Sequence, residues 1–288
     1  MSDLPPLTTA RERADFAQIA LLVAEEAAVL VGSGFRSRPT ITKKGQHDLV
    51  TEYDRASEQL LVQRLGSLAP GLPVVGEEQT STRDVAGRPG LVWYVDPIDG
   101  TTNFVHGHPF WCVAVGLMEN DRPVAGAVVA PMIGVRWTGW VSPASAGGAP
   151  TTIPGAAFRN GEPCAVSVTA QLGESLLATG FPPVRDREPE NNFASFMAVK
   201  RAAQAVRRCG SAAIDLAMVA DGTYEGYWER SLHSWDMVAA SAVVLGAGGT
   251  ITSIDGTAPD YHAGYIAASN GQIHAELLAA IQAGAIGR

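Results

Sequence analysis

The sequence predicts a mixed α/β protein built from layered sheets and helices, and three observations support this fold class. Apolar residues recur at helical spacing over residues 11–31 and again over 57–68, as in amphipathic helices. Short apolar runs rich in branched and aromatic residues, such as 91–95, predict buried strands. In the second half of the chain the two patterns alternate, which favours helices packed on sheets.

The first half is expected to hold two helices followed by a group of strands. Gly32 and Gly34 end the first helix, because glycine is common just past helix C-termini. Apolar runs at 111–118 and 124–130 flank a polar turn, which predicts a hairpin. Residues 134–140 would add another strand, and residues 143–154, rich in Gly, Ala, Pro and Thr, would form a surface loop.

The second half is expected to alternate strands with helices. The predicted strands are 175–179, 205–209, 223–228, 250–254 and 265–269, and the predicted helices are 191–201, 211–220, 235–245 and 273–281. Ser211 is a suitable N-cap for its helix, and Gly222 lies just past the end. No repeat or flexible linker interrupts the chain, so we expect a single unit over 1–288 with approximate halves 1–150 and 151–288.

Composition excludes several classes of protein. The chain is 46% hydrophobic and 17% charged, with a formal net charge of −8, which suits a globular protein and argues against general nucleic-acid binding. Its three cysteines form no C-x-x-C pair, so we expect free thiols in a reducing compartment. The polar start, and the acids Glu25 and Glu26 within the apolar stretch 19–31, predict no secretory signal and no membrane span. We therefore expect a cytoplasmic protein.

Two acids, Asp96 and Asp99, come directly after the predicted buried strand, within the run Asp-Pro-Ile-Asp-Gly-Thr-Thr-Asn-Phe. Pro97 restricts φ, and Gly100 permits a tight turn. Such a turn can aim both carboxylates at one point. It can also leave the N–H groups of Gly100 and Thr101 available to hold a phosphate.

Three more acids follow the same pattern. Glu77 and Glu78 end an apolar run, and Asp236 lies in the first turn of a predicted helix. Taken singly, the glutamates suit a solvated corner, and Asp236 suits a helix dipole. Taken together, carboxylates that share a small volume need protons or cations. Carboxylate and carbonyl oxygens, including that of Ile98, select hard cations such as Mg²⁺ or Mn²⁺.

These motifs together resemble the inositol monophosphatase family. The matching runs are Gly-Glu-Glu at 76–78, Asp-Pro-Ile-Asp-Gly-Thr-Thr-Asn-Phe at 96–104 and Trp-Asp at 235–236, with further similarity at 48–54, 210–213, 248–249 and 268–270. The resemblance extends over roughly residues 16–281. It implies a layered αβαβα sandwich of the inositol monophosphatase and fructose-1,6-bisphosphatase type. It also implies a homodimer and sensitivity to lithium.

The resemblance implies roles for individual residues as well. Two or three Mg²⁺ ions would be held by Glu77, Asp96, Asp99, Asp236 and the Ile98 carbonyl. Thr101 and Asp54, together with Glu77, would orient and deprotonate the attacking water. The phosphate would meet the Gly100 and Thr101 N–H groups, and the alcohol part of the substrate would face Asp99, Ala212, Glu229 and Asp236. Glu78, His233 and Lys44 would lie beside the site, the last in a loop around residues 43–45 that closes over it.

The implied reaction is hydrolysis of a small phosphate monoester by direct attack of a metal-activated water, without a phospho-enzyme. We expect myo-inositol monophosphate as the substrate, because the Glu229 carboxylate can accept hydrogen bonds from substrate hydroxyls. Histidinol phosphate, fructose 1,6-bisphosphate and a 3′-phosphonucleotide are the alternative substrates. A different class of function, a non-catalytic role in a ribosomal RNA transcription complex, is also open.

Overall fold

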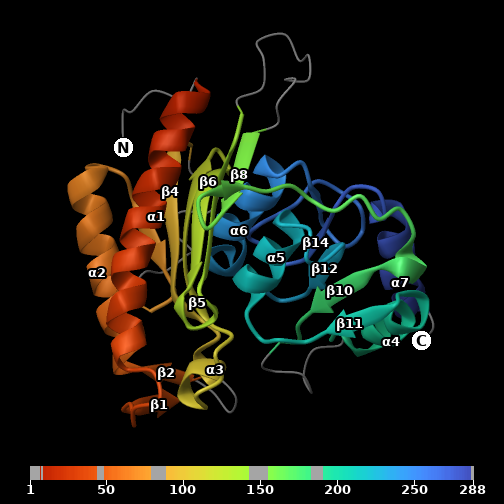
Figure 1. The fold of residues 1–288 in the computed structure, drawn as a ribbon, viewed down its shortest axis with the longest axis horizontal. Helices are drawn as coiled ribbons and strands as arrows, with labels where there is room; N and C mark the ends of the chain where they lie inside the picture. Colours follow the sequence, from red (N-terminus) through yellow and green to blue (C-terminus); the bar gives the residue numbers. More distant parts are fainter. Residues whose placement is uncertain are drawn as a thin grey trace.

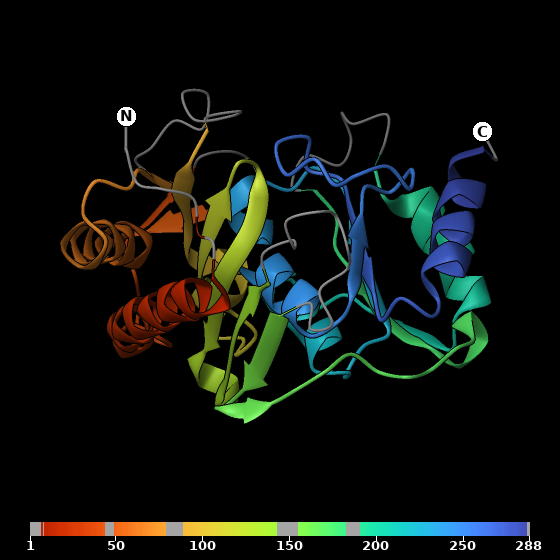
Figure 2. The ribbon, with the colours of Figure 1, turned by 90° about the horizontal axis from the view of Figure 1, so that it is seen from above.

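The computed structural model describes residues 7, 9–43, 49–78, 89–142, 155–182 and 191–286. They form alternating layers of helices and sheets (Figure 1), and the view from above shows the same order (Figure 2). This arrangement confirms the expected αβαβα sandwich. Residue 44 and the predicted loop 143–154 lie outside the described residues.

A seven-stranded sheet forms the first β layer. Its strands, in spatial order, are β3 (Val74–Gly76), β4 (Leu91–Asp99), β5 (Cys112–Glu119), β6 (Arg122–Ala130), β7 (Val135–Val141), β8 (Gly155–Arg159) and β9 (Glu162–Pro163). All neighbours are antiparallel except β3 and β4. The β5–β6 hairpin turns at Asn120 and Asp121, whose φ angles of 50° and 60° suit a type I′ turn.

A five-stranded sheet forms the second β layer. Its spatial order is β11 (Ala205–Arg207), β10 (Leu176–Thr179), β12 (Gly226–Glu229), β14 (Ile266–Ser269) and β13 (Thr250–Thr252). Helices α4 (Phe193–Ala202) and α7 (His274–Ile286) pack together on its outer side (Figure 1). The small hairpin of β1 (Ile41–Lys43) and β2 (Leu49–Thr51) lies beside α3 (Thr101–Val105), and short 3₁₀ helices span Pro131–Ile133 and Leu172–Glu174.

Helices α5 (Ala212–Ala220) and α6 (Ser234–Gly246) lie between the two sheets. Glycines let α6 approach the large sheet closely, since a Cβ atom at Gly116 of β5 would lie 2.5 Å from the Ala239 nitrogen. Because the N-termini of α5 and α6 point toward the end of β4, this packing places Ser211 and Asp236 beside Asp99.

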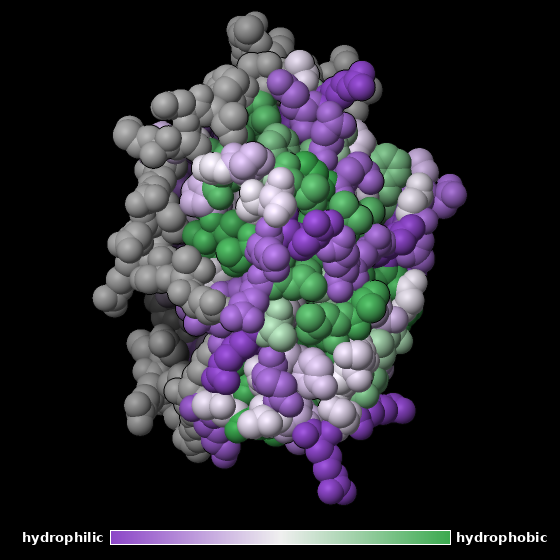
Figure 3. Space-filling view, turned by 90° about the vertical axis from the view of Figure 1, so that its left-hand side faces the viewer, coloured by the Kyte–Doolittle hydropathy of each residue, from purple (hydrophilic) through white to green (hydrophobic). Residues whose placement is uncertain are grey.

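Helices α1 (Ala10–Ser33) and α2 (Glu52–Leu68) cover the outer face of the large sheet. Figure 3 shows this side of the molecule, where apolar and charged side chains are interspersed. Among the described helices, α1 alone is long and apolar enough to cross a membrane by length and composition. Nevertheless α1 packs on β5, β6 and β7 and buries one face, as a core helix does.

Two predicted boundaries differ in ways that matter for the site. The helix expected from residue 57 begins at Glu52, because Thr51 and Asp54 form a capping box at its start. The strand expected at 91–95 continues to Asp99, so Asp96 and Asp99 belong to its end rather than to a separate turn. An irregularity in the pairing with β5 separates them. The other predicted elements are present with ends shifted by a few residues.

Candidate active site

The end of β4 places two carboxylates and a sharp change of chain direction in one segment. Asp96 is 2% exposed, and its Oδ1 accepts a hydrogen bond of 3.0 Å from the Ile98 N–H. Gly100, with a φ of 98°, begins α3 in the left-handed region, which glycine adopts at little cost. A Cβ atom there would lie 3.1 Å from the carbonyl oxygens of Gly210 and Phe110. Glycine at this position therefore serves both conformation and close packing.

The N-terminus of α5 holds the Asp99 carboxylate. Its Oδ2 accepts hydrogen bonds from the Ser211 hydroxyl at 2.7 Å and the Ala213 N–H at 2.6 Å, and Oδ1 accepts from the Ala212 N–H at 3.3 Å. Helix N-termini favour negative charge. Burial still raises the pKa of Asp99, because it outweighs these hydrogen bonds. Ser211 also caps α5, as predicted.

Thr101 and Asp54 form the contact that the resemblance implies. The Thr101 hydroxyl lies 3.0 Å from Asp54 Oδ1 and 3.0 Å from the Ile98 carbonyl oxygen. The other oxygen of Asp54 accepts hydrogen bonds from the Thr51 N–H at 2.7 Å and the Thr51 hydroxyl at 2.6 Å. Burial raises the pKa of Asp54 in spite of these hydrogen bonds. A fixed carboxylate of raised pKa beside a hydroxyl is suited to proton transfer.

Asp236 brings a carboxylate from α6 to the same region. Its Oδ2 accepts a hydrogen bond of 2.7 Å from the His233 N–H. Burial and the nearby charge of Asp99 raise the pKa of Asp236 to about 7. Burial, and then the charges of Glu77, Asp99, Asp236 and Asp54, raise the pKa of Asp96 well above its ordinary value. Acids from four separate segments therefore lie close enough to repel one another.

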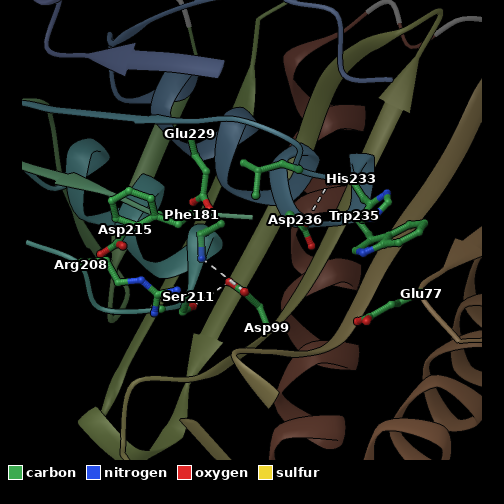
Figure 4. Close-up of a pocket in the computed structure, with 14 residues that line it drawn as sticks. Glu77, Asp99, Phe181, Arg208, Ser211, Asp215, Glu229, His233, Trp235 and Asp236 are labelled. Carbon is green, nitrogen blue, oxygen red and sulfur yellow. Dashed lines mark hydrogen bonds between the residues drawn. The ribbon is translucent and has the colours of Figure 1, made fainter. Parts of the chain in front are cut away.

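A cavity of about 430 Å³ opens beside these acids. Figure 4 shows Glu77, Asp99 and Asp236 around one space, with Glu229 on the opposite wall. The other lining residues are Gly180, Phe181, Arg208, Gly210, Ser211, Ala212, Asp215, Leu232, His233 and Trp235. The cavity therefore has an acidic end and a wall of mixed polar and aromatic residues.

The polar wall is built around Glu229. Its carboxylate accepts a hydrogen bond from the Tyr227 hydroxyl and lies over Gly180, where any Cβ atom would overlap it. Burial raises the pKa of Glu229 to about 8. The His233 ring stacks on Trp235 with 4.6 Å between centroids.

The model of the inositol monophosphatase family matches residues 12–285. The chain belongs to the inositol monophosphatase family. Its curated relatives include the inositol-1-monophosphatase of a Synechocystis strain, 38% identical over 91% of this chain and 88% of the relative. Another, named Nus factor SuhB in Pseudomonas aeruginosa, is 35% identical over 92% of this chain and 94% of that protein.

A solved structure supports the same assignment. The inositol monophosphatase from Anabaena (Nostoc) sp. PCC 7120 superposes with a TM-score of 0.80 at 34% identity, covering 94% of this chain and 97% of that one. Membership of the family confirms the predicted class of enzyme, a phosphoric monoester hydrolase.

The residues expected to hold a cation supply the right chemistry for one. Glu77, Asp96, Asp99 and Asp236 converge, and the Ile98 carbonyl lies against Thr101. Among the described residues, no three His, Cys, Asp or Glu side chains stand as a ready coordination group. The carboxylates thus approach one another without being drawn around one point. The raised pKa values of Asp96, Asp99 and Asp236 mark an excess of negative charge that a hard cation would relieve.

Of the remaining predicted residues, some line the cavity and others do not. Ala212, Glu229 and His233 line the cavity as expected. Gly100 and Thr101 follow directly after Asp99, and their expected contact with phosphate stays a prediction. Glu78 donates its backbone N–H to Glu58 and is half-buried. The expected closing loop with Lys44 lies outside the described residues.

Five lining residues belong to none of the motifs identified in the sequence: Gly180, Phe181, Arg208, Asp215 and Leu232. The sequence offered a sign that Arg208 lies near the site, because this residue stands two positions before the Gly-Ser-Ala-Ala run at 210–213 that begins α5. Gly180 and Phe181 follow the predicted strand at 175–179, and the ends of strands are common positions for binding residues. Nothing in the sequence indicated that Asp215 lines the site, since a single acid inside an apolar helix is typical of a surface position.

Proposed function

We propose that this chain hydrolyses the phosphate ester of a small polyol, with myo-inositol monophosphate as substrate, in a reaction that requires Mg²⁺. The observation that carries the proposal is the convergence of Glu77, Asp96, Asp99 and Asp236 beside the Thr101–Asp54 pair. These acids lie up to 159 positions apart in the sequence (236 − 77). Such a cluster is costly to fold unless cations bind it.

The four carboxylates and the Ile98 carbonyl would hold the Mg²⁺ ions. When bound, Mg²⁺ supplies positive charge that polarises water and balances the charge on the phosphate. The Thr101 hydroxyl, fixed between Asp54 and the Ile98 carbonyl, would orient the attacking water, and Asp54 would take up its proton. The water oxygen would bond to phosphorus in line with the ester oxygen, whose bond to phosphorus breaks, and the departing alkoxide would take a proton from solvent water. No side-chain nucleophile takes part in this scheme.

Glu229 supports a polyol as the alcohol part of the substrate. Its carboxyl group faces the cavity across from Asp99, and Tyr227 holds one of its oxygens. A carboxyl group in this position can accept a hydrogen bond from a substrate hydroxyl, or donate one while protonated. A monoester without further hydroxyls cannot form this hydrogen bond with Glu229.

We expect wild-type protein to show its highest kcat/KM with inositol 1-phosphate in a panel that includes histidinol phosphate, fructose 1,6-bisphosphate and a 3′-phosphonucleotide. Glu229→Ala should raise KM for inositol 1-phosphate about 10-fold, because a hydrogen bond to a substrate hydroxyl is lost. The same variant should change KM for phenyl phosphate by less than about 2-fold. Steady-state kinetics on both substrates would measure this difference.

Glu174→Ala, at an exposed position on the same half of the chain, is the matched control and should leave both KM values unchanged. An equal rise in KM for the two substrates would remove Glu229 as a specificity residue. Faster turnover of histidinol phosphate than of inositol 1-phosphate would contradict the proposed substrate.

The cytoplasmic location, the homodimer and the inhibition by lithium stay predictions from the family. The alternative role in a transcription complex also stays a prediction, which recovery of RNA polymerase subunits with this chain in a pull-down would support.

A further inference from the structure

One face of α2 contacts three separate parts of the active site. Asp54, Ser57 and Glu58 lie at spacings of three and four residues, so their side chains share a face of the helix. Asp54 accepts the hydrogen bond from Thr101 at 3.0 Å, and the Ser57 hydroxyl donates to the Pro97 carbonyl at 3.1 Å. Glu58 accepts a hydrogen bond of 2.7 Å from the Glu78 N–H. Of these three residues, only Asp54 has a role in the proposed reaction.

Glu58 is fully buried, at 0% exposure, in the second turn of α2. A buried carboxylate is costly unless hydrogen bonds compensate it, so its position in the core needs an explanation. Its partner Glu78 is the next residue along the chain from Glu77, whose side chain faces the cavity (Figure 4).

The Glu58 carboxylate also packs flat against the backbone of Gly76. A Cβ atom on Gly76 would lie 2.5 Å from Glu58 Cδ, 2.5 Å from Oε2 and 2.8 Å from Oε1. Gly76 does not lie in the left-handed region, so conformation does not require glycine there. Glycine is required because the Glu58 carboxylate occupies the space that a side chain at this position would need.

Glu58 therefore contacts the residue on each side of Glu77. We infer that Glu58 is a positioning residue, which fixes the peptide carrying Glu77 so that this carboxylate meets Asp96, Asp99 and Asp236. Since Asp54 and Glu58 are one helical turn apart, about 6 Å along the axis, α2 also sets the spacing between the Thr101–Asp54 pair and Glu77. This inference rests on the proposed cation site but not on the substrate.

Direct Mn²⁺ binding to the metal-stripped protein, followed by EPR without substrate, tests the inference. Glu58→Ala should weaken Mn²⁺ binding by about 10–100-fold, as loss of groups that orient metal ligands commonly does. Glu58→Gln, which keeps an oxygen acceptor for the Glu78 N–H, should recover most of that loss. Gln59→Ala, at the exposed neighbouring position on α2, is the matched control and should bind as wild type does.

A double-mutant cycle separates this role from general damage. Gly76→Ala alone should weaken Mn²⁺ binding, because the new methyl group displaces the Glu58 carboxylate. In the Glu58→Ala background the same change should have less than about a 2-fold effect, since the obstructing group is gone. Additive losses would overturn the inference, as would wild-type Mn²⁺ affinity in folded Glu58→Ala protein.

Should Glu58→Ala fail to fold, Gly76→Ala carries the test, and wild-type affinity in that variant would overturn the inference. If the wild type and the Glu58 variants bind Mn²⁺ equally well, only the role of Glu58 is rejected. Absence of Mn²⁺ binding by the wild type would reject the proposed cation site itself, and this inference with it.

Discussion

Asp96→Asn should lower kcat about 100-fold or more while the protein stays folded. Asp96 is buried at the centre of the acid cluster, where Glu77, Asp99 and Asp236 all raise its pKa. Asparagine keeps the shape of the side chain and an oxygen that can accept the hydrogen bond from the Ile98 N–H. It removes the negative charge that a cation would need. Phosphate release from inositol 1-phosphate at saturating Mg²⁺ would measure the loss.

The metal-free variant should melt at the same temperature as the metal-free wild type or higher, because one source of repulsion is gone. Asp15→Asn, on the exposed side of α1, is the matched control and should keep full activity. Near wild-type turnover by Asp96→Asn would contradict a role for this carboxylate in holding the cation.

The metal-free protein should lose stability as pH rises from 5 to 9. The pKa of Asp236 is raised from 3.8 to about 7, and that of Glu229 from 4.5 to about 8. For an acid with a raised folded-state pKa, stability is fully present below the unfolded-state value and is lost as pH rises through the folded-state value. At about 1.4 kcal/mol per pH unit, Asp236 alone should cost about 3 kcal/mol of stability between pH 5 and its folded-state pKa of about 7. A fall in Tm of about 10 °C is expected.

Mg²⁺ should reverse much of this fall, because a cation favours the ionised form of Asp236. Thermal unfolding in EDTA and in Mg²⁺ at each pH would measure the difference, which should widen as pH increases. Asp236→Asn should show a smaller fall in EDTA, since asparagine does not ionise. A metal-free Tm that is constant or rises between pH 5 and 8 would contradict the clustering of these acids.

The acids of the site could be predicted from sequence because each one stands at the end of a recognisable element. Glu77, Asp96 and Asp99 follow apolar runs, and Asp236 follows the start of a helix. The ends of helices and strands meet at the edges of layers. Local sequence patterns therefore predict that these residues lie close together. Glu77, Asp99 and Asp236 line one cavity, and Asp96 lies close enough for their charges to raise its pKa.

The supporting residues could not be predicted in this way. Gly76 reads as an ordinary turn glycine, and Glu58 reads as an exposed helical acid, until the two are seen in contact. Gly180 is explained only by Glu229, which lies 49 positions away (229 − 180). The early start of α2 was missed because its apolar spacing begins at Leu60, whereas its capping box uses Asp54 in place of the more common Glu or Gln.

In the proposed reaction, carboxylates from distant parts of the chain bind Mg²⁺ and thereby permit hydrolysis of the phosphate ester. The most direct test is turnover of inositol 1-phosphate by wild-type protein after thorough chelation, followed by stepwise addition of Mg²⁺. We expect no turnover in the stripped protein and full recovery with added Mg²⁺. Turnover that persists unchanged in the metal-free protein would show that the reaction does not require Mg²⁺.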